Sequence, residues 1–317
     1  MKLITLNSHS LIEENYEEKF SRFILAMLKE KPDILALQEV NQSMEGPELS
    51  QRDLEASGYV PPLSSPEALL EPAHPVRRDN HGYRCAAALR SLGLPLYWTW
   101  VPAKIGYDRF DEGVALFSPY PIRRAEGFYI TGSQDYGNWR SRKALLVSFD
   151  TPWGIQYACS LHTGRWDDPQ EPFSSQWQRL SDRLLPLRHC PIWLLGDFNA
   201  PDSKRGESFD LILSGGWLDA CRMAEEAGME RAADRMAEEA EGKHAAASAP
   251  AKSCWEATVE DGIDGWEDKG IGRGMRIDYI FTNQPVPISS CQVIFKPDCY
   301  GIVSDHRAVM VNADLQL

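Results

Sequence analysis

The chain has 317 residues, of which 43% are hydrophobic, and its formal net charge is −13. This hydrophobic content is ample for a large core, and α/β units of this size occur as one domain. The acidic charge argues against loose, charge-driven binding, so we expect no stable nucleic-acid partner and no membrane partner. No apolar run approaches the length of a signal peptide or a membrane span, and we expect a cytoplasmic protein.

Seven cysteines are scattered along the chain and form no Cys-x-x-Cys pair. An odd number without paired spacing favours reduced thiols over a disulfide framework or a zinc site. We therefore predict free cysteines, as in a cytosolic protein.

Hydrophobic periodicity predicts strands that alternate with helices only in places. In the first half it predicts strands at 2–6, 34–37, 96–101 and 113–117, helices at 16–29 and 80–91, and a loop at 42–80 that holds one short helix. In the second half it predicts strands at 143–149, 155–161, 192–195, 276–281, 291–296 and 308–313, and helices at 173–187 and 211–218. More strands than helices in this order indicate a layered α/β protein with mixed sheets.

Residues 223–252 differ from the rest because they are almost wholly Ala, Glu, Arg and Met. Such a composition is typical of an exposed helix with a loose tail. We predict one domain over 1–317, with residues 223–252 as a helical or flexible insertion within it.

The stretch Leu194-Leu195-Gly196-Asp197-Phe198-Asn199 holds an acid and an amide at the end of an apolar strand. Residues two apart on an extended chain face the same way, so both side chains can reach one point. That pair can seat a hard cation and a phosphate, although an Asx turn that closes a strand explains it equally well. Residues 34–41 repeat the pattern of an apolar run, an acid and an Asn, which suggests two related halves.

Polar residues follow many of the predicted strands in the same way. They are Asn7, Glu39, His162, Asp197, Asn199, Asp278, Asp305 and His306. One such residue is usually a cap or a turn, but eight at the ends of apolar strands indicate a shared site.

These positions carry motifs that resemble the endonuclease/exonuclease/phosphatase superfamily. The similar stretches are 5–7, 37–40, 113–118, 160–162, 196–199, 276–281 and 304–306, in the superfamily's order. The resemblance implies a four-layer α/β sandwich, in which two mixed β-sheets pack face to face with helices outside. It also implies a metal-dependent phosphoesterase.

The resemblance implies a role for each of these residues. Glu39 resembles the main metal carboxylate, with Asn7 beside it and Asp305 completing the metal environment. His306 resembles the catalytic histidine, and Asp278 the carboxylate that orients it. Four further positions resemble phosphate and water ligands, namely Asp197 with Asn199, the second histidine His162, and Arg142. Asp111 or Glu112 falls where some members pair an acid with the second histidine.

The chemistry of these residue types agrees with those roles. Oxygen ligands select Mg²⁺, or alternatively Mn²⁺, over zinc. Ester hydrolysis needs an aligned water and neutralised phosphoryl oxygens, and His306 with Asp278 behind it can orient or deprotonate that water. Whether His306 or Asp197 takes the proton stays open at this point.

Loop stretches carry a narrower resemblance, to bacterial maltose 6'-phosphate phosphatases. They are 5–15, 37–43, 78–80, 105–108, 166–168, 171–173, 205–207, 265–266, 283–286 and 303–306. The insertion at 223–252 and Arg165 depart from that pattern. We expect a sugar phosphate as substrate, with Tyr107, Trp139, Trp166 and Trp266 offering aromatic faces to the sugar. The alternatives are a nuclease, a sphingomyelinase-type phosphodiesterase, or a binding module without activity.

Overall fold

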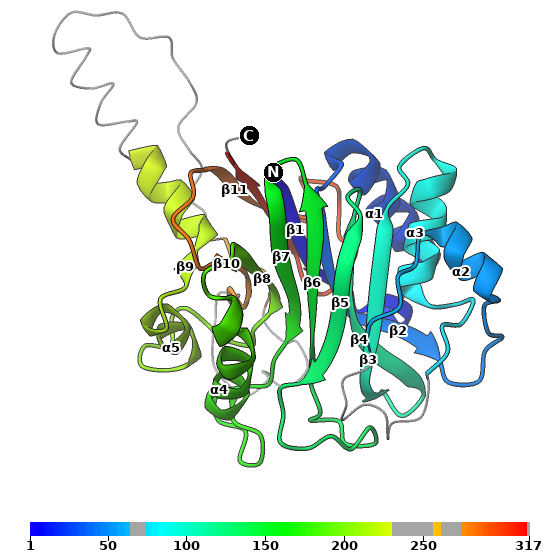
Figure 1. The fold of residues 1–317 in the computed structure, drawn as a ribbon, viewed down its shortest axis with the longest axis horizontal. Coiled ribbons are helices and arrows are strands. Elements are labelled where there is room, and N and C mark those ends of the chain that lie inside the picture. The colour runs from blue at the N-terminus through cyan, green and yellow to red at the C-terminus, as the bar shows by residue number, and fades with distance from the viewer. Residues whose placement is uncertain (64–73, 230–255, 261–273, 316–317) are drawn as a thin grey trace, which may run out of the picture.

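A computed structural model of the chain describes residues 1–63, 74–229, 256–260 and 274–315. Within these ranges two six-stranded sheets pack face to face, and helices cover their outer sides (Figure 1). The predicted four-layer α/β sandwich with two mixed sheets is therefore confirmed.

The first sheet has the strand order β11-β12-β1-β2-β4-β3. Its strands are β1 (Lys2–Asn7), β2 (Ile34–Ser43), β3 (Tyr97–Gly106), β4 (Phe110–Ser118), β11 (Ile288–Ile294) and β12 (Ala308–Ala313). The second sheet has the order β5-β6-β7-β8-β10-β9. Its strands are β5 (Ile122–Tyr129), β6 (Lys143–Thr151), β7 (Gly154–His162), β8 (Ile192–Asp197), β9 (Leu218–Asp219) and β10 (Asp278–Thr282).

Each sheet contains one parallel pair, β1 with β2 and β7 with β8, among antiparallel neighbours. The repeated sequence pattern at 34–41 and 192–199 falls on β2 and β8, the second strand of each pair. The two halves thus place corresponding strands at the centre of the two sheets.

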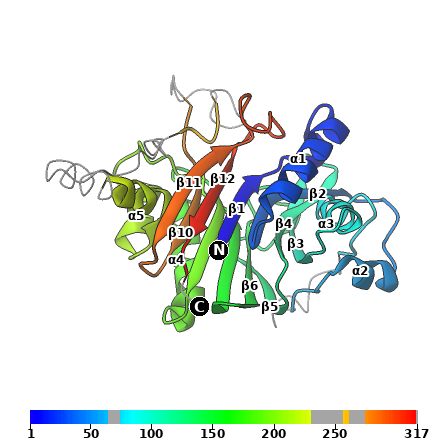
Figure 2. The same ribbon diagram turned by 90° about the horizontal axis from the view of Figure 1, so that it is seen from above.

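Helices lie on opposite outer sides of the sandwich (Figure 2). α1 (Tyr16–Glu30), α2 (Gln51–Ser57) and α3 (His81–Ser91) cover the first sheet, and α4 (Phe173–Leu184) and α5 (Ser208–Ser214) cover the second. Three apolar clusters fill the space between successive layers, and the middle one joins the inner faces of both sheets. Burial of these apolar faces is the main force that holds the layers together.

Several predicted boundaries differ from those observed, for local reasons. The helix predicted at 173–187 ends at Leu184 and continues as a 3-10 turn at Leu185–Leu187, because Pro186 cannot extend an α-helix. The helix predicted at 211–218 spans Ser208–Ser214. Strand β5 was not predicted, since Arg123 and Arg124 interrupt its apolar pattern; charged residues are usual on an edge strand.

One cysteine prediction is wrong. Cys221 and Cys291 form a disulfide with a Cα–Cα distance of 5.1 Å. The bridge joins the chain beyond β9 to β11, which are edge strands of the two different sheets. Seventy residues separate the two cysteines, so spacing could not reveal the pairing.

The proposed insertion is only partly described. Residues 220–229 are helical, and residues 230–252 of the predicted insertion lie outside the described part of the chain.

Candidate active site

The ends of the two parallel strand pairs bring the predicted polar residues together. Asn7 ends β1, and Glu39 lies in β2 beside it. His162 ends β7 and stands in register with Asp197, which ends β8. Asp278 opens β10 directly opposite Asp197. Carboxyl ends of parallel strands meet at one edge of a sheet, which is why residues distant in sequence converge here.

Glu39 is aimed into the site by an irregular backbone. The pairing of β2 with β4 shifts register between Leu37 and Val40, as in a β-bulge, and Glu39 has a φ of 50°. A left-handed conformation at a non-glycine residue costs free energy and persists only where the surroundings fix it. Its Oε2 atom is buried and has no hydrogen-bond partner. Burial, followed by the nearby carboxylate of Glu112, raises the pKa of Glu39.

Asn7 links the two sheets within the site. Its Nδ2 donates to Glu39 Oε1 at 2.9 Å and to Asp197 Oδ2 at 3.1 Å. Its Oδ1 accepts the backbone N–H of His9 at 3.2 Å. Asn7 therefore fixes the separation and orientation of two buried carboxylates.

His306 lies between two carboxylates of the second sheet. Its Nδ1 is 2.9 Å from Asp278 Oδ2, and its Nε2 is 3.8 Å from Asp197 Oδ2. Burial lowers the pKa of His306, but Asp278 and Asp197 outweigh that effect and raise it to about 10. Burial raises the pKa of Asp197 to about 7 despite the opposing effect of His306. The predicted pairing of Asp278 with His306 is thus present as a geometric contact.

His162 has a different environment from His306. Its Nε2 lies 3.6 Å from Asp197 Oδ2. Burial, Arg142 and Lys104 lower its pKa well below the usual value, so His162 is neutral. Neither acid proposed as its partner contacts it: Glu112 pairs with Lys104, and Asp111 accepts hydrogen bonds from Gln42 and Tyr136.

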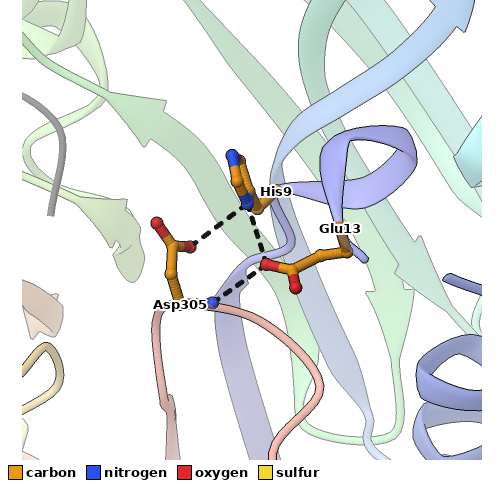
Figure 3. A group of neighbouring side chains, drawn as sticks. All are labelled: His9, Glu13 and Asp305. Atoms are coloured by element: carbon orange, nitrogen blue, oxygen red, sulfur yellow. Dashed lines mark hydrogen bonds and ion pairs between the residues drawn. The ribbon is translucent and has the colours of Figure 1, made fainter. Parts of the chain in front are cut away.

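His9, Glu13 and Asp305 form a further group of ionisable residues, at the edge of the site (Figure 3). His9 Nδ1 is 2.8 Å from Glu13 Oε1 and 3.7 Å from Asp305 Oδ1. The backbone N–H of Asp305 donates to Glu13 Oε1 at 3.1 Å. The sequence motifs assigned no role to His9 or Glu13, because only the fold brings the first loop against the Asp305 loop.

A cavity of about 350 Å³ opens above these residues. Its lining includes Glu39, His162, Asp197, Asn199, Asp305 and His306, together with Lys104, Tyr107, Glu112, Trp139, Arg140, Arg142 and Asp168. Asn7 and Asp278 lie beneath that surface, where they hold the lining residues in place.

The predicted substrate-binding residues divide into two groups. Tyr107 and Trp139 line the cavity and are 43% and 52% exposed, and Arg142 lines it while buried. Trp166 is half-buried, packs against the apolar cluster beneath α4, and does not line the cavity. Trp266 lies outside the described residues.

The donor set of the site fits a hard divalent cation. Glu39, Asp197 and Asp305 supply carboxylate oxygens around one cavity. The unpartnered, buried Oε2 of Glu39 is the type of atom that a bound cation would satisfy. Among the described residues, Asp197, Asp278 and His306 also lie close enough together to ligate an ion, as do His9, Glu13 and Asp305.

A family model described as the endonuclease/exonuclease/phosphatase family matches residues 4–306. A family protein from Leptotrichia buccalis C-1013-b has 24% identity over 99% of both chains, with a TM-score of 0.76. Truncated TDP2 from Caenorhabditis elegans has 14% identity over 98% of this chain and 96% of its own, with a TM-score of 0.54. A 3'-5' exonuclease (NExo) from Neisseria meningitidis has 18% identity over 99% of this chain and 100% of its own, also with a TM-score of 0.54.

These identities establish a shared fold. A comparison with curated proteins gives no match. In the described part of the chain, each helix is too short or too polar to span a membrane.

Proposed function

Because the chain belongs to the endonuclease/exonuclease/phosphatase family, we propose that it is a Mg²⁺-dependent hydrolase that releases phosphate from a sugar phosphate such as maltose 6'-phosphate. The observation that carries this proposal is one cavity of about 350 Å³ with the histidine–carboxylate cluster as its floor. Its volume falls in the range of small-molecule sites.

Glu39 and Asp305 would hold the metal ion, with Asn7 orienting the carboxylate of Glu39. In the structure, the N–H₂ group of Asn7 points toward Glu39. The side-chain amide would have to flip before its oxygen could bind the metal ion. A bound Mg²⁺, or Mn²⁺ in its place, would act as a Lewis acid that offsets charge on the phosphoryl oxygens and the leaving oxygen.

Asp197 is our candidate for the group that accepts a proton from the attacking water. Against the lowering effect of burial, Asp278 and Asp197 raise the pKa of His306 to about 10, which favours its protonated form, so His306 would enter the reaction as a donor. The pKa of Asp197, about 7, leaves this carboxylate able to exchange a proton near neutral pH. Asn199 helps to fix it, because its backbone N–H donates to Asp197 Oδ1 at 2.9 Å.

His162 and Arg142 are our candidates for phosphoryl oxygen ligands. Both are buried in the cavity wall, and neutral His162 can donate one hydrogen bond. Arg142 uses its Nη1 to donate to Trp139 O at 2.7 Å, which ties the guanidinium to the exposed indole at the rim. Its Nε is buried and has no hydrogen-bond partner, and a guanidinium turned toward the cavity could pair it with an anion.

The rim supports a sugar as the rest of the substrate. Tyr107 and Trp139 are exposed at the rim, with Arg140 over the Trp139 ring, and Asp168 and Glu171 line the same cavity while their carboxylates accept hydrogen bonds from protein N–H groups. Aromatic faces stack on the C–H side of a sugar while carboxylates bind its hydroxyls. Part of this rim comes from 105–108, 166–168 and 171–173, three of the stretches that resemble maltose 6'-phosphate phosphatases.

A nuclease is the second candidate. Arg140 and Arg165 add positive charge to the cavity lining, and the fold is shared with a 3'-5' exonuclease. The net charge of −13 and the pairing of Arg140 with Asp168 at 2.9 Å reduce the field that would attract a polyanion. A sphingomyelinase-type phosphodiesterase or an inactive binding module would use the same cavity without sugar-phosphate hydrolysis.

The test is a panel of substrates assayed with Mg²⁺ and after chelation. It contains maltose 6'-phosphate, hexose phosphates, an aryl phosphate, an aryl phosphate diester, single-stranded DNA and plasmid DNA. We expect Mg²⁺-dependent phosphate release from the sugar phosphates with the highest kcat/KM. DNA cleavage orders of magnitude more efficient than phosphate release would replace this proposal with the nuclease, and no activity on any substrate would favour the binding module.

A further inference from the structure

Lys104 is a buried lysine in the wall of the active-site cavity. It lies in β3, is 9% exposed and lines the cavity beside Gly106. Its partner is Glu112 on the neighbouring strand β4, with Nζ 3.1 Å from Oε1, and the two residues stand in register. Lysine is seldom buried, because removing an ammonium from water is costly unless it is paired.

The backbone around this pair is adapted to hold it. The pairing of β3 with β4 shifts register between Pro102 and Lys104. A Cβ atom at Gly106 would lie 2.3 Å from Glu112 Oε2, so only glycine leaves room for the carboxylate in this position. Glu112 therefore holds Lys104 at the cavity wall from the neighbouring strand β4.

A second buried cation, Arg142, lines the same cavity as Lys104. Burial and then Arg142 lower the pKa of Lys104, and both cations lower the pKa of His162. Arg142 is 8% exposed, lines the same cavity, and has a buried Nε without a partner. Glu112 is the ion-pair partner of Lys104, and the charges of Glu112, Glu39 and Asp197 also act on Arg142. An anion bound between the two cations would relieve their mutual repulsion.

We propose that Lys104 is a specificity-determining residue that, with Arg142, binds the terminal oxygens of a phosphate monoester and selects it against a diester. The proposal deepens the function proposed above and rests on it. A monoester carries a charge of about −1.5 to −2 and three terminal oxygens near neutral pH, whereas a diester carries one charge and two such oxygens. Two cations at one wall complement the more highly charged group.

The test compares wild type with Lys104→Met/Glu112→Gln, in which both charges of the pair are removed so that neither is left buried alone. The substrates are p-nitrophenyl phosphate and bis(p-nitrophenyl) phosphate, assayed with saturating Mg²⁺. We expect kcat/KM for the monoester to fall about tenfold to a hundredfold, the range for losing a hydrogen bond to a charged group, while the diester changes by about threefold or less. The inhibition constant of inorganic phosphate should rise by a similar factor.

The matched control is Lys2→Met/Glu30→Gln. That pair also joins a lysine to a glutamate, at 2.7 Å, but at the opposite end of β1 from Asn7. It should leave both substrates unchanged. Lys104→Arg keeps the charge and should retain most of the preference for the monoester, and thermal melting of each variant separates unfolding from lost binding.

Equal losses on the monoester and the diester, or an unchanged inhibition constant for phosphate, would overturn the role of Lys104. That failure is distinct from failure of the proposed function, which the wild-type protein alone decides. If wild type prefers the diester or DNA, the sugar-phosphate proposal is wrong. If wild type prefers the monoester but the ratio does not change in Lys104→Met/Glu112→Gln, only this inference is wrong.

Discussion

Asp278→Asn tests whether Asp278 acts through His306. The Asp278 side chain is fully buried and lies 2.9 Å from His306 Nδ1. Asparagine keeps the shape of the side chain but removes the charge that favours protonated His306. Its amide can also hold the His306 imidazole in the wrong tautomer. In a serine protease triad the same change lowers kcat by about 10⁴, and we expect a loss of about 10³ to 10⁴ here.

The double variant gives the magnitude that decides the question. If Asp278→Asn and His306→Ala each cost about 10⁴ independently, the pair would cost about 10⁸. If Asp278 acts only through His306, kcat of the double variant should be no lower than kcat of the less active single variant. The difference from independent effects corresponds to a coupling free energy of about 5 kcal/mol. Such a value is far above the usual error of a double-mutant cycle.

The assay is initial-rate hydrolysis of an aryl phosphate at saturating substrate and Mg²⁺. Circular dichroism and thermal melting must show that all three variants are folded. Losses that multiply in the double variant would falsify the pairing and leave Asp278 as a structural carboxylate.

Three further predictions concern the metal ion, the sugar and acid stability. Glu39→Gln should lower activity about a hundredfold or more with folding intact, and high Mg²⁺ or Mn²⁺ should partly restore it. Full activity of this variant after exhaustive chelation would exclude Glu39 as a metal ligand. Trp139→Ala should raise KM for a sugar phosphate more than for an aryl phosphate, whereas Trp166→Ala should mainly lower the melting temperature; the reverse pattern would contradict our description of the rim. Burial, helped by Arg84, lowers the pKa of His81 to about 3. As pH falls, His81 therefore takes up a proton in the unfolded chain before it does so in the folded chain. The free energy of unfolding decreases between about pH 6.5 and pH 3, and the decrease is about 2 kcal/mol at pH 5. His81→Gln should remove that loss in denaturant titrations at pH 7.5 and pH 5, with exposed His189→Gln as control; an unchanged pH dependence would show that another group is responsible.

The sequence predicted the central part of the site because strand ends are recognisable locally. Apolar runs that end in an acid or amide mark β1, β2 and β8, and the layered fold carries those ends to one edge. Lys104 follows a Pro and an Ala at a predicted strand end and looks like any surface lysine. Its burial depends on Glu112 and Gly106, and the space that glycine leaves is a property of packing between strands.

Contacts between loops were equally beyond prediction. His9 and Asp305 are almost 300 residues apart, and only the antiparallel pairing of β1 with β12 brings their loops together. The Cys221–Cys291 disulfide depends in the same way on the approach of two edge strands. Trp166 was predicted to bind the substrate but packs on an apolar cluster. A tryptophan in a loop has the same sequence pattern in both cases, so the sequence could not distinguish them.

Backbone strain in the two halves of the fold supports the view that the site was shaped for chemistry rather than stability. Glu39 in β2 and Asn199 after β8 both have left-handed backbones, with φ of 50° and 46°, although neither is glycine. This conformation costs about 1–3 kcal/mol at Glu39 and less at Asn199, since asparagine adopts it more readily, and strained residues tend to occur at functional sites. The strain at Glu39 presents an unpartnered carboxylate oxygen, and the strain at Asn199 lets its N–H hold Asp197. A turn that merely closed each strand would not need a buried oxygen without a partner. The strain at Glu39, which accompanies this unpartnered oxygen, is therefore better explained by a bound ligand than by a turn alone.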